Sequence, residues 1–590
     1  MKYHIVLLAL LFAANHIFAD ETSTISDDTL VFKANSKLYD CALISGLRQN
    51  TQLQLIQNNR FELYQSLFGI PYSINYSLDG VELNSMIDGG INLINFNGSY
   101  YKSPKISTAS GFSPIPTMEL TSGIPEKSSF SAFTHFGNTK LLANIEAIYR
   151  KNNFFILTHA NYNNQNVYKV PERINDLTID SNNNLLNSEF EGRSIFIKSG
   201  IIEDYSELTA EYLHVNNYRN IPLNYTSSVP EYLREKQYKM NLLSIIYKSK
   251  LTSNASLRGN FYYCDNKRIL DSYDDSSYLT QQTEISYRNL TKEQIIGFDI
   301  STKLDLAKIG LSEIGAFFKR MQLYEKANYN MKSYDYVNEI LGLKWSQAVP
   351  ISEKFALNTN IVYKYINPVY PANNGLKHQS LVEYSIAIMH KLGDNFQYSA
   401  SYSKNGTFPY IKYIYSKNAP VLDNNFCDIA QLNFDLKLFD IPIQLNGFYS
   451  GFSNYFKNSG EIARLTGKTI GSGITLQKQT KYVNFNLAYT YLKQLETNTL
   501  FPKFPENNFY LSLGKEYSIG LKWQIESRML IDLAPNQTTA KLLDIWIQQK
   551  IIKNINVFFY ADNILNEYYE LCPGFPAQGF NFCFGFNFEI

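Results

Sequence analysis

The sequence has few of the features that mark helical membrane proteins or nucleic-acid-binding proteins. Only 3 of its 590 residues are Trp. After residue 19 no apolar run approaches the roughly 18 residues that a membrane-spanning helix needs, which excludes a helical membrane protein. Lys and Arg number 54, and Asp and Glu number 53. Because neither sign of charge is in excess, nucleic acid is not expected as a partner.

Motifs that carry catalysis or hold a metal are also missing. There is no Gly-x-Ser-x-Gly, no His-Glu-x-x-His and no Gly-rich phosphate loop. The histidines after residue 19 are scattered, and no paired spacing marks a metal or haem site: they are His135, His159, His214, His378 and His390. We therefore predict that the protein is not an enzyme and holds no cofactor or resident metal.

Cysteine is scarce as well. All 5 cysteines follow residue 19, and none shows CxxC spacing. Cys572 and Cys583 are the only close pair, and they are a candidate disulfide in an oxidising compartment. Cys41, Cys264 and Cys427 are expected to remain unpaired.

Residues 1–19 are typical of a secretory signal peptide. Lys2 supplies the positive start, an apolar core begins at Ile5 and runs to Phe18, and small Ala19 precedes Asp20. The apolar stretch is too short to span a bilayer comfortably, so a cleaved signal is favoured over a membrane anchor. We expect the rest of the chain to be exported.

The rest of the chain is rich in aromatic residues that alternate with polar ones. Tyr and Phe number 45 and 39, yet the mean hydropathy is only −0.24. The segment 355–365 places Phe, Leu, Thr, Ile and Tyr on one face and Ala, Asn, Val and Lys on the other, and 483–491 repeats the pattern. Such alternation predicts strands with one lipid-facing and one polar face.

The connections between these segments alternate in length. Short ones fall near 151–153, 351–354, 391–395 and 478–481, and long polar ones near 163–192, 216–236, 264–280, 366–378, 403–425 and 452–467. Tight turns at one end and long loops at the other are typical of an outer-membrane barrel. We therefore predict an all-β transmembrane barrel of about 22 antiparallel strands, the class whose wide lumen is plugged. The sequence lacks the fixed repeat that a soluble solenoid requires. It also predicts more strands than a sandwich usually has.

The last residues of the chain have one wholly apolar face. Phe580, Phe582, Phe584, Phe586, Phe588 and Ile590 alternate with polar or small residues. This segment resembles the terminal strand of outer-membrane barrels. The resemblance implies that it closes the barrel and serves as a signal for the barrel assembly machinery.

Residues near the predicted mature N-terminus resemble the TonB box of TonB-dependent outer-membrane receptors. The segment comprises Asp28, Thr29, Leu30, Val31, Phe32, Lys33 and Ala34. The resemblance implies that it can add as a strand to the sheet edge of a periplasmic partner, the TonB complex of the inner membrane. Residues 38–47 resemble the early plug segment of the same family, in which a short helix ends near a Gly, here Gly46.

Two further motifs carry the same resemblance. Residues 73–84 are similar to the core strand and turn of the family's plug, with the turn at Asp79, Gly80, Val81, Leu83 and Asn84. Asp-Gly suits a tight turn because Gly tolerates positive φ. Residues 562–569, which include Asn563, Leu565 and Tyr568, resemble the motif before the last barrel strand. Residues 89–94 resemble the family's Gly-Gly-x-Ile-Asn segment.

The sequence also departs from the family pattern. Family plugs carry Arg-Gly segments whose charges pair with the barrel wall, whereas 61–65 and 117–123 have no Arg. The resemblance otherwise implies four regions: a signal peptide (1–19), a periplasmic leader with the box-like segment (20–34), a small α/β plug domain in the lumen (35–122) and the transmembrane barrel (123–590). The missing arginines put energy-coupled transport in question.

The resemblance implies a receptor in the Gram-negative outer membrane. Because a filled lumen forbids free diffusion, we expect it to import a scarce, bulky nutrient such as an iron chelate, cobalamin or another metal complex. The expected partners are the TonB complex, outer-membrane lipid, the barrel assembly machinery and a small-molecule ligand. A passive or degenerate barrel, which would be a porin, an adhesin or a binding-only receptor, is the alternative that the missing arginines favour.

Overall fold

The computed structural model describes most of the chain after residue 116 and parts of the segment before it. The described residues are 29–31, 53–57, 63–67, 70–71, 75–86, 92, 103–107, 117–171, 179–180, 182–227, 230–283, 286–328, 333–370, 378–408, 424–458, 461–497, 504–534 and 537–590. The predicted signal peptide, Asp28, Phe32–Ala34 and the helix expected near 38–47 lie outside them.

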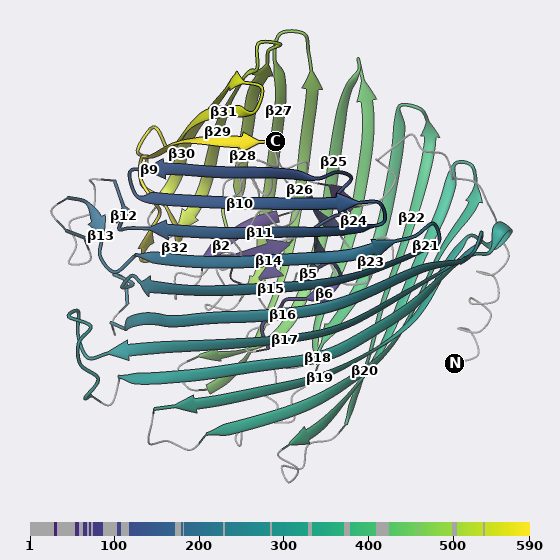
Figure 1. The fold of residues 1–590 in the computed structure, drawn as a ribbon, viewed down its shortest axis with the longest axis horizontal. Coiled ribbons are helices and arrows are strands. Elements are labelled where there is room, and N and C mark those ends of the chain that lie inside the picture. Colours follow the sequence, from purple (N-terminus) through teal and green to yellow (C-terminus); the bar gives the residue numbers. More distant parts are fainter. Residues whose placement is uncertain are drawn as a thin grey trace.

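The described residues from 129 onward form a closed antiparallel barrel of 22 strands (Figure 1), which confirms the predicted fold class. The strands are β9 (Ser129–Gly137), β10 (Lys140–Lys151), β11 (Phe154–Gln165), β14 (Phe190–Ile202), β15 (Ser206–Ile221), β16 (Tyr232–Thr252), β17 (Ala255–Tyr273), β18 (Tyr287–Asp305), β19 (Leu311–Ala327), β20 (Tyr334–Ser352), β21 (Phe355–Tyr370), β22 (Gln379–Gly393), β23 (Phe396–Thr407), β24 (Asn425–Leu438), β25 (Ile441–Asn458), β26 (Glu461–Gln479), β27 (Asn484–Thr497), β28 (Asn507–Glu516), β29 (Leu521–Ala534), β30 (Gln537–Ile552), β31 (Ile555–Asp562) and β34 (Asn581–Glu589).

The last strand closes the barrel. β34 pairs with β31 on one side and with β9, the first barrel strand, on the other. Closure gives a hydrogen-bonding partner to every strand edge, which hydrocarbon cannot supply. No helix in the described part of the chain is long and apolar enough to cross a membrane.

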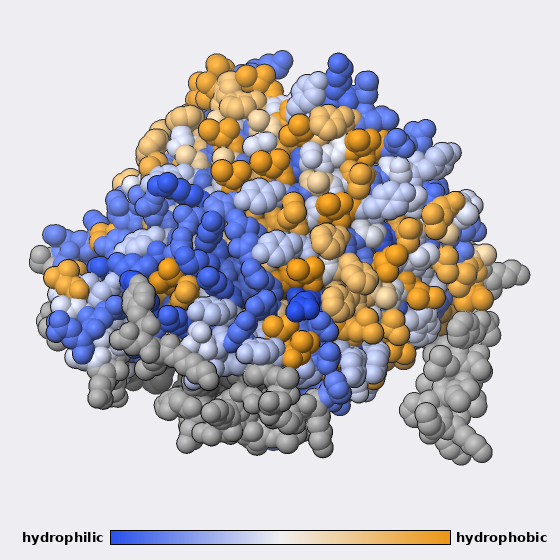
Figure 2. Space-filling view, turned by 60° about the horizontal axis from the view of Figure 1, so that its bottom comes forward, coloured by the Kyte–Doolittle hydropathy of each residue, from blue (hydrophilic) through white to orange (hydrophobic). Residues whose placement is uncertain are grey.

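The wall alternates between lipid-facing and inward side chains. In β14, Ile195 and Ile197 are exposed on the outside, whereas Phe196 and Lys198 are buried inside. In the space-filling view, hydrophobic side chains cover much of the right-hand part of the surface, and hydrophilic ones prevail at the left-hand end (Figure 2). That end carries the long connections, which places it outside the cell and the short turns in the periplasm.

Many strands are longer than the sequence predicted. β16 has 21 residues, about twice the 9–11 that cross a bilayer. Much of the loop expected at 264–280 belongs to β17, which continues to Tyr273, and β25 and β26 occupy most of 452–467. The loop boundaries predicted there were wrong because polar residues were assigned to loops, whereas the wall simply continues above the membrane.

Two small hairpins cover the outer end near the barrel seam. They are β12 (Tyr168–Lys169) with β13 (Asn184–Leu185), and β32 (Glu570–Cys572) with β33 (Phe575–Pro576). Leu185 and Phe575 pack in one buried cluster with Leu233 and Leu270 of the wall. The described outer loops on this side therefore have a core of their own.

The described N-terminal segments form two sheets inside the barrel (Figure 1). One has the order β1 (Thr29–Val31), β7 (Ser103–Ser107), β8 (Thr117–Thr121), β5 (Asn75–Leu78) and β6 (Val81–Glu82). The other consists of β2 (Leu53–Gln57), β3 (Leu63–Leu67) and β4 (Ile70–Pro71). The single described helical turn, η2 (Ala307–Ile309), lies in the connection between β18 and β19.

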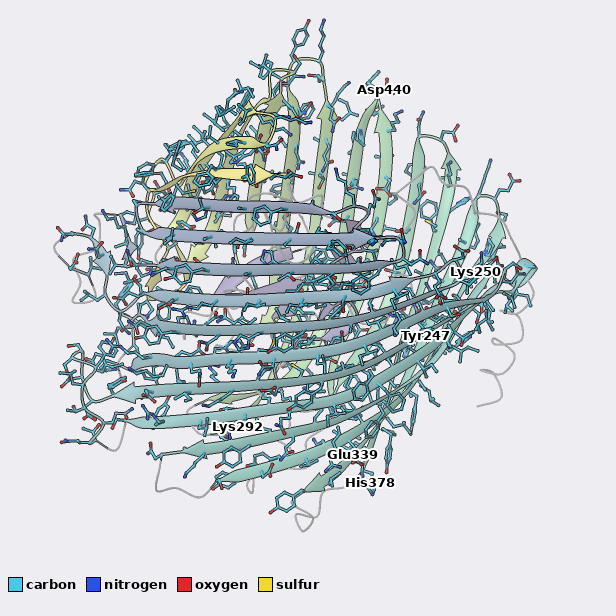
Figure 3. The ribbon with its side chains drawn as sticks, in the orientation of Figure 1. Tyr247, Lys250, Lys292, Glu339, His378 and Asp440 are labelled. Atoms are coloured by element: carbon cyan, nitrogen blue, oxygen red, sulfur yellow. The ribbon has the colours of Figure 1, made fainter. Side chains whose placement is uncertain are left out.

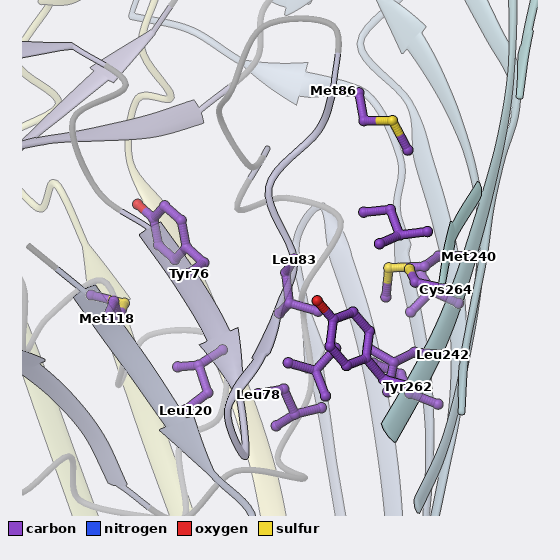
Figure 4. Packing of buried hydrophobic residues seen from close by; sticks show 14 of the residues in the cluster. Tyr76, Leu78, Leu83, Met86, Met118, Leu120, Met240, Leu242, Tyr262 and Cys264 are labelled. Carbon is purple, nitrogen blue, oxygen red and sulfur yellow. The ribbon is translucent and has the colours of Figure 1, made fainter. Parts of the chain in front are cut away.

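The main hydrophobic core lies between the first of these sheets and the wall. Tyr76, Leu78 and Leu120 of the plug belong to the same buried cluster as Leu242 and Tyr262 of the wall (Figure 4). Because each fully buried apolar side chain contributes about 1.5–3 kcal/mol, this contact holds the described part of the plug in the lumen.

Candidate functional site

The predicted turn at Asp79-Gly80 joins β5 to β6. Asp79 has φ 48° and Gly80 has φ 89°, the two positive values that a two-residue type I′ turn requires. The guanidinium of Arg258, on β17, lies where a Cβ of residue 80 would be, and its Nη2 donates to the Asp79 carbonyl oxygen at 2.9 Å. Glycine is therefore needed both for the backbone conformation and for the contact with the wall.

The other residues of this turn motif complete the hairpin. Val81 and Leu83 are buried, and the Leu83 amide donates to the Tyr76 carbonyl oxygen at 2.8 Å. The side-chain oxygen of Asn84 accepts a hydrogen bond from the Tyr76 amide at 2.7 Å. This amide side chain thus takes the place of a backbone partner where the hairpin ends.

The Asp79 carboxylate is bound by both the plug and the wall. Within the plug, the Ser122 hydroxyl donates to it at 2.5 Å. From the wall, Lys198 Nζ lies 3.4 Å from Asp79 Oδ2 and 2.8 Å from Glu211 Oε1 of β15, and it donates to Ser122 Oγ at 2.8 Å. The Lys198 side chain is only 5% exposed. A buried ammonium needs hydrogen-bond acceptors to compensate for lost water, and the plug supplies two of them, Asp79 and Ser122.

A second charged contact lies on β6 of the same hairpin. Lys319 of β19 donates to the Glu82 carboxylate. Burial by itself would raise the pKa of the Glu82 carboxyl, but the charge and the hydrogen bond of Lys319 outweigh burial and lower this pKa from its ordinary value of 4.5. Nearby, the Ser85 hydroxyl donates to Glu293 Oε1 of β18 at 2.9 Å.

These contacts give a different picture from the one that the missing plug arginines suggested. The plug does form charged contacts with the wall, but their polarity is the reverse of the family pattern. Asp79 and Glu82 of the plug are the acids, and Lys198, Arg258 and Lys319 of the wall are the cations. The absence of Arg at 61–65 and 117–123 therefore does not leave the plug without electrostatic contacts to the barrel.

The box-like segment lies at the edge of the plug sheet. Thr29–Val31 form β1, which pairs antiparallel with β7 through Thr29 with Ser107, Leu30 with Ile106 and Val31 with Lys105. Asp28 and Phe32–Ala34 lie outside the described residues. An edge strand held by one neighbour can be exchanged for pairing with another sheet, since only one ladder has to open.

The predicted motif before the last strand forms a braced turn. Asn563 has φ 47°. Its side-chain nitrogen Nδ2 donates to the carbonyl oxygens of Glu567 at 2.9 Å and Gln578 at 3.1 Å. Its side-chain oxygen Oδ1 accepts from the backbone amide of Glu567 at 2.9 Å. Asn566 accepts from the Phe580 amide at 2.8 Å. These two amide side chains set the path of the chain into β34.

The remaining residues of that motif differ in their surroundings. The Tyr568 hydroxyl lies 2.9 Å from the Tyr225 hydroxyl and donates to the Glu570 carboxylate, which ties the last loop to the connection after β15. Leu565 is exposed. On β34 itself, Phe584 and Phe586 face outward and are exposed, as expected for a strand with a lipid-facing side.

The candidate disulfide is not formed. Among the described cysteines, neither Cys572 nor Cys583 is in a disulfide, and the same holds for Cys264 and Cys427. Cys583 is buried on the inward face of β34 in a cluster with Phe133 and Phe558, whereas Cys572 packs against the outer cluster around Phe575. Nearness in sequence did not bring the pair together because the loop and the strand run to different clusters.

The histidines remain dispersed in the described structure. His390 lies 3.2 Å from the Tyr398 hydroxyl, His214 lies 2.7 Å from Asn241 Oδ1, and His378 stacks on Tyr365. Within the described residues no group of His, Cys, Asp or Glu could hold a metal ion.

Sequence reasoning missed the wall residues of the site. These residues lie on five different strands, each on the inward face: Lys198, Glu211, Arg258, Glu293 and Lys319. A usable signal was present, because alternation assigns these charged residues to the lumen at mid-strand. Their partners could not be read from it, since pairing depends on where the plug sits inside the barrel.

Comparisons with known proteins define the class of this fold. The sequence matches no protein-family model and no curated protein. The structure is similar to the FrpB iron transporter from Neisseria meningitidis (F3-3 variant), with a TM-score of 0.74, 12% identity and coverage of 98% of this chain and 99% of that chain. It is also similar to the copper transporter OprC, with a TM-score of 0.77, 11% identity and coverage of 95% and 100%.

A third similar structure is the ferric-catecholate import receptor Fiu from E. coli K12, with a TM-score of 0.73, 12% identity and coverage of 98% of this chain and all of that one. The fold is therefore that of the TonB-dependent receptors, shared over nearly the whole chain at low identity. A closed barrel of this fold with an apolar outer face is integral to the Gram-negative outer membrane.

Proposed function

We propose that this protein is a TonB-dependent transporter that imports a scarce, bulky nutrient across the outer membrane. The similar structures are named as iron and copper transporters and as a ferric-catecholate import receptor. They are transporters and receptors rather than enzymes. An iron chelate, cobalamin or another metal complex is the cargo class that this kinship supports.

One observation carries the proposal: the hairpin 75–86 lies in the lumen and is bound to the wall at several points. Asp79 and Glu82 are each paired with a wall lysine, and Leu78 is fully buried against the wall cluster. A barrel filled in this way does not offer an open path for diffusion. Moving the plug requires work, and the outer membrane has no ATP to supply it.

The position of β1 supports coupling to an inner-membrane partner. Within the described residues its pairing with β7 covers Thr29 to Val31, and the release of an edge strand opens one ladder of hydrogen bonds. Once free, the segment 28–34 can add as a strand to a partner's sheet edge. A pull on this segment would act on β7 and, through β8, on the hairpin that carries Asp79 and Glu82.

The alternative is a barrel that binds a ligand without transporting it. It was favoured by the missing plug arginines, and the reversed charge contacts remove that reason. A passive porin fits poorly with a hairpin that is fixed to the wall on several sides. The binding-only receptor remains the alternative that an experiment must separate from the transporter.

The decisive experiment deletes residues 28–34 and measures uptake and surface binding separately. Growth of a strain that lacks the protein is first compared under iron, cobalamin, copper and nickel limitation, and the nutrient that shows a defect is then used in radiolabelled form. We expect the deletion to abolish uptake while binding to whole cells is kept. Deletion of residues 21–27, an equal length of the predicted leader, is the matched control.

A deletion strain that takes up the nutrient as fast as the control strain would refute energy-coupled transport. Loss of both binding and uptake would instead point to a folding defect, so the amount of assembled barrel is measured in the same cells. The variant Leu30→Pro provides a second test, because proline removes a backbone donor that strand addition needs.

A further inference from the structure

Three lysines stand side by side on the outer face of the wall. They are Lys239 of β16, Lys267 of β17 and Lys292 of β18, which we name the lysine row. Lys239 is the register partner of Lys267, and Lys267 is the register partner of Lys292. The same register line continues through Asn216 of β15 to Arg193 of β14. The line therefore crosses five neighbouring strands, three of which carry the lysine row.

Alternation shows that the lysine row faces outward. Lys239 shares a strand face with Leu243, Ile245 and Tyr247, which are all exposed on the lipid side. Lys292 is exposed and shares its face with Ile296 and Phe298, which are exposed as well. The inward face of these strands carries buried residues instead, such as Met240 and Glu293.

The lysine row lies just beyond the apolar band, at the end of the barrel that carries the long loops. Lys239 precedes Leu243 by four positions, which is about 13 Å along a strand at 3.3 Å per residue. In Figure 3, Lys292 lies toward the long-loop end of the wall, and Tyr247 and Lys250 lie toward the other end. The row is thus at the height of the headgroups of the outer leaflet.

A polar layer between the band and the lysine row marks this boundary. The Tyr212 hydroxyl donates to Asn241 Oδ1 at 3.2 Å, and the Asn241 amide donates to Asp265 at 3.1 Å. Gln294 donates to the Tyr263 hydroxyl at 3.3 Å. Tyrosines with polar partners at this level are typical of the interfacial aromatic girdle.

The lysine row keeps a net positive charge, although Asp265 lies on the same face two residues from Lys267. Within the described structure none of the three lysines forms an ion pair, and Asp265, on the same face of β17, is engaged by Asn241. Some other outward cations are paired, such as Arg193 with Glu191 at 2.7 Å and Arg320 with Glu339 at 3.3 Å. Like charges directly opposite each other destabilise a sheet, and an anion bound there would offset their repulsion.

We propose that the lysine row binds the phosphate groups of an anionic lipid of the outer leaflet. The occupant follows from charge and place: three lysines beside one carboxylate, Asp265, leave more than one positive charge for an anion to meet, and the apolar band below the polar layer accepts its acyl chains. A free phosphate would gain nothing from Leu243, Ile245 and Phe298. The proposal rests on the barrel and its membrane level, and it holds whether or not the protein transports a nutrient.

The test uses the purified full-length protein in detergent and counts bound lipid by native mass spectrometry. The probe is lipid A that carries two phosphates, compared with the same lipid after dephosphorylation and with inorganic phosphate. We expect the triple variant K239Q/K267Q/K292Q to lose affinity for the bisphosphorylated lipid by about fivefold for each lysine removed. The triple variant with arginine at the same positions should keep binding.

A matched control removes the same charge elsewhere on the outer face. Lys404, Lys468 and Lys493 also face outward, but none of them is the register partner of another. K404Q/K468Q/K493Q should bind the lipid as the unchanged protein does. Equal loss in both triple variants would overturn the proposal, as would equal binding of the dephosphorylated lipid or displacement of the lipid by inorganic phosphate alone. Heat-modifiable gel mobility verifies that every variant is folded.

Discussion

At the scale of residues, the contact between plug and wall depends on a few charged side chains in a confined space. Lys198 and Lys319 reach inward from the wall to acids on one short hairpin. The hairpin itself is shaped by Asp79 and Gly80, whose positive φ values make the turn that presents these acids. Removing the hairpin would take one carboxylate from each lysine, although Lys198 would keep Glu211 of the wall, so each pair is a point of attachment.

The Glu82–Lys319 contact predicts how acid affects the plug. The pKa of Glu82 is lowered in the folded protein from its ordinary value of 4.5, so the contact stabilises the docked hairpin at every pH above that value. The stabilisation is lost as the pH falls below 4.5 and through the lowered pKa. Hydrogen exchange of the segment 75–86, corrected for the intrinsic pH dependence, should stay slow from pH 8 to about 5 and rise below about 4.

The variant Glu82→Gln tests the same point at constant pH. It keeps the shape of the side chain but removes its charge, so we expect exchange of the hairpin at pH 7 to rise roughly tenfold, which corresponds to about 1–2 kcal/mol. Glu119→Gln, on β8 of the same sheet, is the control and should leave the exchange rate unchanged. An equal effect of the two substitutions would argue against a specific role of the Lys319 contact.

The residue scale also shows what sequence could predict. The turn at Asp79-Gly80 followed from local chemistry alone, because two adjacent residues specify it. Its partner Lys198 is 119 positions away in the chain, and no local pattern connects the two. The alternation of β14 places Lys198 in the lumen, but the plug residue at the same height depends on how the plug sits in the barrel.

At the scale of elements, the barrel is a succession of hairpins that closes through β34. The closing strand carries exposed Phe584 and Phe586 outside and buried Cys583 inside. Its entry is set by Asn563 and Asn566, whose amide groups bind the backbone of the preceding loop. The strand thus needs both a lipid-facing side and a fixed starting point.

The closing strand can be tested with one substitution. Phe586 faces lipid near the middle of β34, where a lysine costs about 2–4 kcal/mol. We expect Phe586→Lys to reduce the amount of assembled barrel, measured as the heat-modifiable form on gels of outer-membrane fractions. Phe586→Leu keeps an apolar side chain and should assemble normally. If the lysine and leucine variants assembled equally well, Phe586 would not lie against lipid.

The barrel strands also show what the sequence could and could not predict. Period-two alternation predicted about 22 strands, and the described residues contain 22 in the barrel. The ends of the strands were harder to predict. Residues 264–273 were expected in a loop because they are polar, but they pair as part of β17. Above the membrane the outward face of a wall strand no longer has to be apolar, so the alternation that marks a strand weakens.

At the scale of the whole molecule, the barrel and the plug form one closed body. The core cluster includes plug residues such as Leu78 and wall residues from several strands, so neither part buries its apolar surface without the other. On one side of the barrel, the outer face carries an apolar band, and the lysine row lies between this band and the long-loop end. These features together place the molecule in the outer membrane with the described N-terminal sheets inside the barrel.

The central claim is that the plug closes the lumen, and electrical conductance of single molecules in a planar lipid bilayer tests it most directly. The full-length protein should show no open-channel current, because the hairpin fixed by Lys198 and Lys319 fills the path. A variant without residues 35–122 should conduct strongly through the empty barrel. If the full-length protein conducted ions as freely as that variant, the plug would not close the pore and the proposed transport mechanism would be wrong.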